Sequence, residues 1–131
     1  MAVAQRGQIV FPNRAKQIKD FSGLLFASIT PTDIDGLIEY HGKGYVLIEL
    51  KLGDAQVPQG QRLALKRLTD DLQRANRLTL CLIAKHETVN CDEVIDVANA
   101  IVSEYRYKGQ WHEAKADKTV RQFIEKFMEL V

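Results

Sequence analysis

Two carboxylates and a lysine with a suggestive spacing lie within residues 30–51, TPTDIDGLIEYHGKGYVLIELK. Asp35 precedes a Glu-x-Lys tripeptide made of Glu49, Leu50 and Lys51. Hard cations such as Mg²⁺ prefer oxygen ligands, usually one or two carboxylates with waters and a substrate phosphate. Asp35 and Glu49 could supply the carboxylates, and the Leu50 main-chain carbonyl could add a third oxygen. An ammonium beside them could orient or deprotonate a water, or offset charge on a phosphorane. Such a set could bind a divalent metal and hydrolyse a phosphodiester.

A β-hairpin is predicted to bring these groups together. Residues 33–41 and 45–52 each alternate apolar and polar side chains with a period of two, and a short glycine-containing link joins them. A three-residue loop that pairs His41 with Tyr45 is the favoured register, because a two-residue loop would bury one set of charges.

Side-chain parity in this register gathers the charged residues. They lie on one face, opposite the apolar set: Asp33, Asp35, Glu49 and Lys51. Asp35 becomes a diagonal neighbour of Glu49, at roughly 7–8 Å between Cα atoms. Asp33 competes with Asp35 for a metal, and we favour Asp35 for its contact with Glu49. Leu37 and Leu47 share the charged face, so that face is expected to be partly covered.

A helix over residues 59–75, entered after Pro58, is expected to provide the cover. Its predicted apolar stripe consists of Leu65, Leu68, Leu72 and Ala75. Gln61 falls on the same stripe, one turn before Leu65, so its amide is expected to point toward the sheet. Gln61 therefore joins the charged set as a fourth polar member.

The other segments predict a mixed α/β domain. A strand, a helix and a second strand in succession favour parallel pairing of residues 45–52 with a later, doubly buried strand. Residues 94–107 fit either a helix or a strand, and we favour a strand. The expected elements are a helix over 13–20, a strand over 24–29, a buried strand over 78–84 and a final helix over 119–130.

The composition indicates a single domain over residues 1–131. No apolar run is long enough to cross a membrane, and the N-terminus lacks the apolar core of a secretory signal. Cys81 and Cys91 show no metal-ligand spacing and are expected to be reduced thiols in a cytosolic protein. The net charge of +1 does not mark the whole chain as a polyanion binder, so local basic clusters matter more.

The order Asp-Gly, strand, Glu-Leu-Lys, loop, Gly-Gln, helix resembles the PD-(D/E)xK nuclease superfamily. It is especially similar to small phage-type members with a TPTDIDG stretch, and the resemblance spans about residues 20–85. It implies a restriction-endonuclease-like αβββαβ core within an α/β (mixed α+β) fold. A mixed central sheet would be flanked by helices, with a C-terminal extension ending in a helix.

The resemblance also implies an activity, namely Mg²⁺- or Mn²⁺-dependent hydrolysis of DNA. A structure-selective endonuclease of phage replication, recombination or processing would act in the host-cell cytoplasm. Carried over by position, Asp35 and Glu49 would be metal ligands, Lys51 the catalytic lysine and Gln61 the accessory polar residue. Cutting a four-way junction would need a homodimer, and the expected partner is DNA with no membrane. The basic residues expected to contact it are Arg14, Lys16, Arg62 and Lys66.

The chain departs from the superfamily pattern in three places. Thr32 separates Pro31 from Asp33, where the superfamily name has Pro-Asp adjacent. No glutamate precedes Glu39, so Asp20 or a water would have to replace the glutamate that many members supply from their first helix. Leu65 stands where a Gln-x-x-x-Tyr pattern would have tyrosine.

Two other functions stay open. One is a non-catalytic nucleic-acid- or protein-binding module that keeps the nuclease fold, and the other is a structural subunit of an assembly. Trp111, Tyr105 and Tyr107 could stack on bases, although core packing is the favoured role for them.

Overall fold

The computed structural model describes residues 6–7, 20–90 and 93–131. The predicted helix over 13–20 lies almost wholly outside these ranges, so it is neither supported nor opposed. The same holds for Cys91 and for the basic residues Arg14, Lys16 and Lys19.

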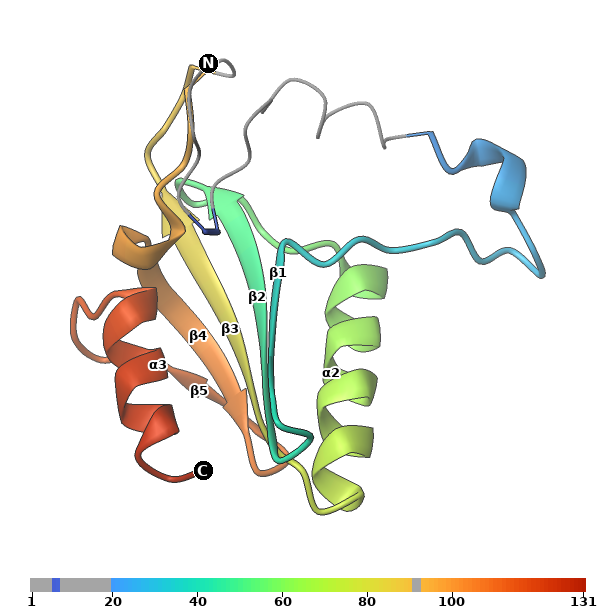
Figure 1. Cartoon of the computed structure of the whole chain (residues 1–131). Helices are drawn as coiled ribbons and strands as arrows, with labels where there is room; N and C mark the ends of the chain where they lie inside the picture. The colour runs from blue at the N-terminus through green and yellow to red at the C-terminus, as the bar shows by residue number, and fades with distance from the viewer. Residues whose placement is uncertain (1–5, 8–19, 91–92) are drawn as a thin grey trace.

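Five strands form one mixed sheet in the order β1-β2-β3-β4-β5 (Figure 1). β2 and β3 are parallel, which confirms the predicted pairing, and the other neighbours are antiparallel. The bounds are β1 Gly36–Tyr40, β2 Gly44–Leu52, β3 Leu78–His86, β4 Ile101–Tyr107 and β5 Gln110–Glu113. The protein is therefore a mixed α/β fold.

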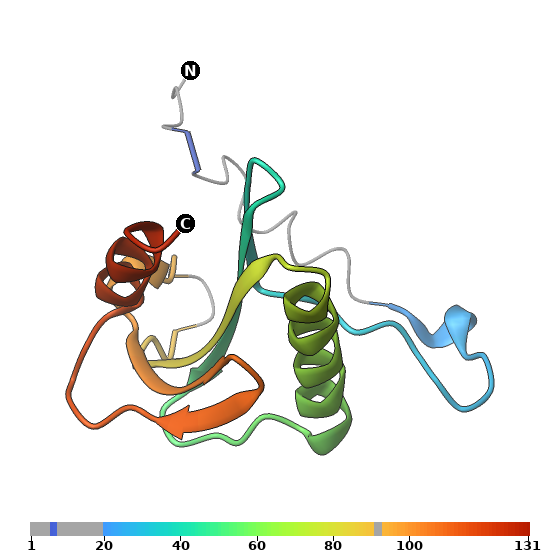
Figure 2. The same cartoon turned by 90° about the horizontal axis from the view of Figure 1, so that it is seen from below.

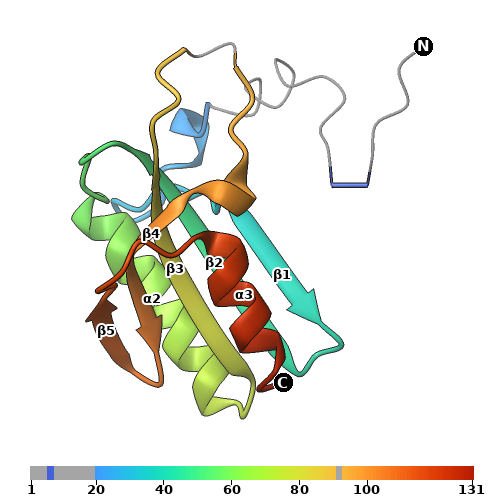
Figure 3. The same cartoon turned by 90° about the vertical axis from the view of Figure 1, so that its left-hand side faces the viewer.

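Two helices cover the two faces of the sheet. Helix α2, Gln59–Arg74, connects the parallel strands on one face, and helix α3, Val120–Met128, covers the other (Figure 2). Figure 3 shows α3 on the near side of the sheet and α2 behind it. β3 is the central strand and is buried on both faces, as predicted. Among the described residues, no helix has the length and apolar character that a membrane span requires.

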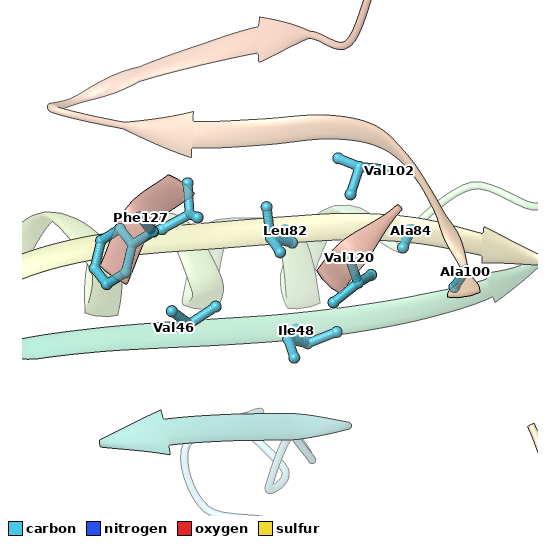
Figure 4. Close-up of a cluster of buried hydrophobic side chains, with 9 residues drawn as sticks. Val46, Ile48, Leu82, Ala84, Ala100, Val102, Val120 and Phe127 are labelled. Carbon is cyan, nitrogen blue, oxygen red and sulfur yellow. The ribbon is translucent and has the colours of Figure 1, made fainter. Parts of the chain in front are cut away.

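The larger core lies between the sheet and α3. Thr119 caps α3 by accepting a hydrogen bond from the Gln122 main-chain N–H, so the helix begins where the sequence predicts. Its apolar side then meets alternate residues of β2, β3 and β4 (Figure 4). The buried members of this core are Val46, Ile48, Leu80, Leu82, Ala84, Ala100, Val102, Val120 and Phe127.

The α2 face has a smaller core and corrects the predicted helix stripe. Leu65 packs on Leu47 and Cys81, whereas Leu68 is 40% exposed and Ala75 is exposed. Thr69 takes the inner position one turn after Leu65, because its hydroxyl donates to the Leu65 carbonyl at 2.7 Å and is satisfied when buried. Cys81 is fully buried in this core, so it has the packing role predicted for it, and the same burial raises the pKa of its thiol to about 12.

Residues 24–29 do not form a strand of the sheet, contrary to prediction. Ser22–Leu24 form one 3₁₀ turn, and Phe26 pairs with Ile29 in an isolated bridge. Ala27 and Ser28 have φ of 51° and 63°, which reverses the chain inside the predicted strand. The segment extends away from the sheet (Figure 1), so two strands rather than three precede α2.

The predicted strand over 94–107 is confirmed only in its second half. Residues Val97–Asn99 form a 3₁₀ turn before β4. β4 and β5 then form a hairpin through Lys108 and Gly109, both with positive φ.

A buried ion pair fixes this hairpin against α2. The Arg106 guanidinium donates to both Asp70 carboxylate oxygens, at 2.7 and 2.8 Å, and to the Gly109 carbonyl. These bonds lower the pKa of Asp70. Asp70→Ala would leave a buried guanidinium unpaired and is expected to destabilise the fold by about 3–5 kcal/mol.

Asp71→Ala is the matched control, because it removes a neighbouring aspartate whose pair with Arg74 is exposed. Asp71→Ala should lower the free energy of unfolding by less than about 1 kcal/mol. Urea unfolding of both variants measures the difference, and equal losses would contradict the role assigned to Asp70.

Candidate active site

The β1–β2 hairpin carries the acidic residues in a register shifted from the predicted one. Tyr40 pairs with Gly44, and Glu39 rather than His41 pairs with Tyr45. His41 and Gly42 have φ of 50° and 67°, so the turn begins before the predicted glycine link. The shift is of two residues, which keeps every side chain on its predicted face. Extended past Gly36, this register places Asp35 directly opposite Glu49.

Asp35 lies immediately before β1 begins at Gly36. Its Oδ2 accepts a hydrogen bond from the Leu50 main-chain N–H at 2.8 Å. In hydrogen-bonded antiparallel pairs a residue directs both its N–H and its C=O at the neighbouring strand. The Leu50 carbonyl is therefore directed to the same edge as Asp35. Asp35 is exposed, which leaves this side of the site open to a ligand.

Glu49 is the buried member of the site. It is only 2% exposed, because it lies on the face of β2 that α2 covers. Its Oε1 lies 3.3 Å from Lys51 Nζ, whereas its Oε2 is buried without a hydrogen-bond partner. Burial is the main cause that raises the pKa of Glu49 to about 7, and the Asp35 charge adds to it, while Lys51 opposes the shift. A nearby cation would stabilise the charged form of this buried carboxylate.

The raised pKa predicts that Glu49 weakens the metal-free fold at alkaline pH. Its pKa in the folded protein lies above the ordinary 4.5, so the unfolded chain loses this proton first as pH rises. Stability therefore falls between about pH 4.5 and 7 and stays low above that window. In EDTA, Glu49→Gln should be more stable than the wild type at pH 8 by on the order of 1–3 kcal/mol.

The measurement is urea unfolding of both proteins at pH 4.5 and pH 8. The difference should disappear at pH 4.5, where Glu49 is protonated and resembles glutamine. A difference that is the same at both pH values would contradict the assignment.

Gln61 contacts the segment of chain that precedes β1. Its Nε2 donates to the Asp33 main-chain carbonyl at 3.5 Å. The amide thus points toward the segment before β1 and contacts its backbone two residues before Asp35. Asp33 makes a smaller contribution to the pKa of Glu49 than Asp35 does, which places Asp35 as the closer charge.

Lys85 is a member of the site that the sequence argument missed. It is the register partner of Lys51 across the parallel β2–β3 pair. Directly paired residues of adjacent strands point to the same face, so a second ammonium lies beside Lys51 on the α2 face. Only the β2–β3 register reveals it, because a helix separates the two lysines in the chain.

Two of the basic residues expected to bind nucleic acid, Arg62 and Lys66, lie one turn apart on α2. Arg62 donates to both Glu104 oxygens at 2.8 Å and lies over the Trp111 ring. Lys66 Nζ lies 3.5 Å from Asp70. Both cations are therefore engaged by carboxylates of the protein. Arg14 and Lys16 lie outside the described residues.

The oxygen donors of the site match part of what a hard divalent cation requires. No group of three or more His, Cys, Asp or Glu side chains in the described part of the chain could hold a metal ion. Two carboxylates and one main-chain carbonyl nevertheless fit the ligands that Mg²⁺ takes when waters and phosphate complete its shell. The unpartnered Oε2 of Glu49 is the observation that favours this fit.

Comparisons with protein-family profiles, curated proteins and solved structures found no match to this chain. A proposal for the function of the site must therefore be argued from the geometry of its residues.

Proposed function

We propose that this protein is a Mg²⁺- or Mn²⁺-dependent deoxyribonuclease of the PD-(D/E)xK type. The observation that carries the proposal is Glu49, a buried carboxylate with one unpartnered oxygen, between the Asp35 carboxylate and the Lys51 ammonium. If Glu49 and Lys51 formed only a structural ion pair, the exposed Asp35 carboxylate beside them would have no role. The open side at Asp35 gives a phosphate access to the set.

Each residue has a separate role in the proposal. Asp35, Glu49 and the Leu50 carbonyl would hold the cation, which when bound polarises the phosphate and acidifies water. Lys51 holds or removes a proton of the attacking water and offsets charge on the phosphorane. Gln61 positions the segment before β1 through the Asp33 carbonyl, and Lys85 adds a positive charge for the phosphate oxygens.

A restriction-endonuclease-like core belongs to the same proposal. The chain has the order strand, strand, helix, strand in β1, β2, α2 and β3. A restriction-endonuclease-like core places its acids and its lysine on elements in this order, and here Glu49 and Lys51 lie on β2. A dimer would be required only for paired cuts in two strands, such as those that resolve a branched junction.

Purified protein incubated with plasmid, branched and single-stranded DNA tests the proposed reaction. Cleavage should occur in Mg²⁺ or Mn²⁺ and stop in EDTA. Glu49→Gln should abolish it, while Lys43→Ala, which removes an exposed lysine at the hairpin tip, should not. DNA binding without cleavage, unaffected by EDTA and by Glu49→Gln, would instead indicate a non-catalytic binding module.

A further inference from the structure

An open cavity of about 860 Å³ lies on the α3 face of the sheet, between β4, β5 and α3. Its lining includes the half-buried rings of Tyr105, Tyr107, His112 and Phe123. Tyr105 stacks on His112 with ring centroids 5.0 Å apart and an interplanar angle of 22°, and it also contacts Phe123. These rings form an aromatic floor that remains accessible through the open side of the cavity.

Positive charge borders this floor. Lys115, Lys118 and Lys126 line the cavity and are exposed, together with the amide of Gln122. In the part of the chain that the structure describes, no carboxylate forms an ion pair with these three lysines. Glu113 is the acidic residue of the lining, so the border keeps a net positive charge.

The wall between β5 and α3 is attached to the sheet at both ends. The Ala114 N–H donates to the Ser103 carbonyl at 3.0 Å, and the Val102 N–H donates to the Lys118 carbonyl at 2.9 Å. Between these bonds the chain arcs away from the sheet before α3 begins (Figure 2). The cavity is therefore built into the fold, at a size typical of ligand clefts.

We propose that this cavity binds a short segment of single-stranded nucleic acid. Bases would stack on the Tyr105 and Tyr107 rings, as they do on aromatic platforms of single-strand-binding proteins. The lysines at the border would contact the adjacent phosphates. An aromatic floor alone would suit any apolar ligand, and the unpaired lysines select an aromatic polyanion.

This site is distinct from the proposed nuclease centre. Tyr105 pairs with Leu82 and points to the α3 face, whereas Glu49 pairs with Ile83 and points to the α2 face. The two sites lie on opposite faces of one sheet. The proposal therefore goes beyond the metal-dependent reaction and holds whether or not that reaction occurs.

Fluorescence anisotropy with labelled ten-residue oligothymidylate in EDTA tests the proposal. A variant with Lys115→Gln, Lys118→Gln and Lys126→Gln should bind at least about ten-fold more weakly. In the wild type, three phosphate contacts predict a log–log salt slope of about −2, and the variant should lose most of it. The charge-matched control carries Lys43→Gln, Arg67→Gln and Arg77→Gln, at exposed positions away from the cavity.

The proposal predicts that the control variant and Glu49→Gln bind like the wild type. NMR should show oligonucleotide-induced shifts at the Tyr105, Tyr107 and His112 rings and none at the Tyr45 ring, which does not line the cavity. Equal weakening in both triple variants, or no shift at the three rings, would overturn the proposal. Thymidine monophosphate that binds as tightly as the oligonucleotide would also overturn it, because the cavity would then be a mononucleotide site.

Discussion

Lys51→Ala is expected to slow DNA cleavage by about 10²–10⁴-fold, the range that positioned acid–base groups contribute. Lys51 Nζ lies 3.3 Å from Glu49 Oε1, and its side chain is 23% exposed. Removing it takes an ammonium from the water and phosphate without opening the core, so the protein should stay folded. The effect should appear in the rate of the first turnover rather than in DNA affinity.

Lys51 also influences the metal ligand beside it. It opposes the rise in the pKa of Glu49, so Lys51→Ala should raise that pKa further and weaken cation binding near neutral pH. Rates are therefore best compared at saturating Mn²⁺ and at about pH 8.5, where Glu49 is ionised in both proteins. First-turnover nicking of supercoiled plasmid is the measurement, with Lys43→Ala as control. A Lys51→Ala rate within about three-fold of the wild type would contradict the role of Lys51 in the chemistry.

Glu49→Gln is expected to reverse the order of stability between metal-free and metal-bound conditions. Without metal the variant should be the more stable protein above pH 7, because the buried charge is gone. With Mn²⁺ at about 1,000 times its dissociation constant, the wild type should gain about 4.1 kcal/mol and the variant nothing. The wild type should then be at least as stable as the variant.

Thermal unfolding at pH 8 with EDTA or with Mn²⁺ gives the four values required. Glu39→Gln is the matched control, since it neutralises an exposed glutamate on β1 and should respond to Mn²⁺ like the wild type. Asp35→Asn should lose the Mn²⁺ effect and gain less metal-free stability than Glu49→Gln, because the Asp35 charge is the smaller cause of the raised pKa of Glu49 and burial is the larger one. A Mn²⁺ effect of equal size in the wild type and Glu49→Gln would show that the ion binds elsewhere.

The face of the hairpin could be predicted from the sequence, and its register could not. Alternation of apolar and polar residues decides which side chains are buried, and this holds under any shift by two. The register depends on the turn, where His41 adopts a positive φ that is uncommon outside glycine. The observed register places Asp35 opposite Glu49 rather than diagonal to it, which brings the two carboxylates closer than expected.

Contacts between distant segments account for most of what the sequence argument missed. Lys85 joins Lys51 only through the pairing of β2 with β3, and a connection through a helix leaves no local signal for that register. Arg106 and Asp70 likewise come from separate elements, so their charges alone gave no sign of a buried pair. An apolar composition predicted a strand over residues 24–29, although apolar residues alone do not decide between a strand and a turn.

The most direct measurement of the central claim is the anomalous scattering of Mn²⁺ in crystals of the wild-type protein at about pH 8. One strong peak is expected between the Asp35 and Glu49 carboxylates, within about 2.0–2.3 Å of an oxygen of each and close to the Leu50 carbonyl. The peak should be absent from Glu49→Gln crystals grown in the same way. Full Mn²⁺ occupancy at another place, with none between Asp35 and Glu49, would contradict the proposed metal-dependent nuclease.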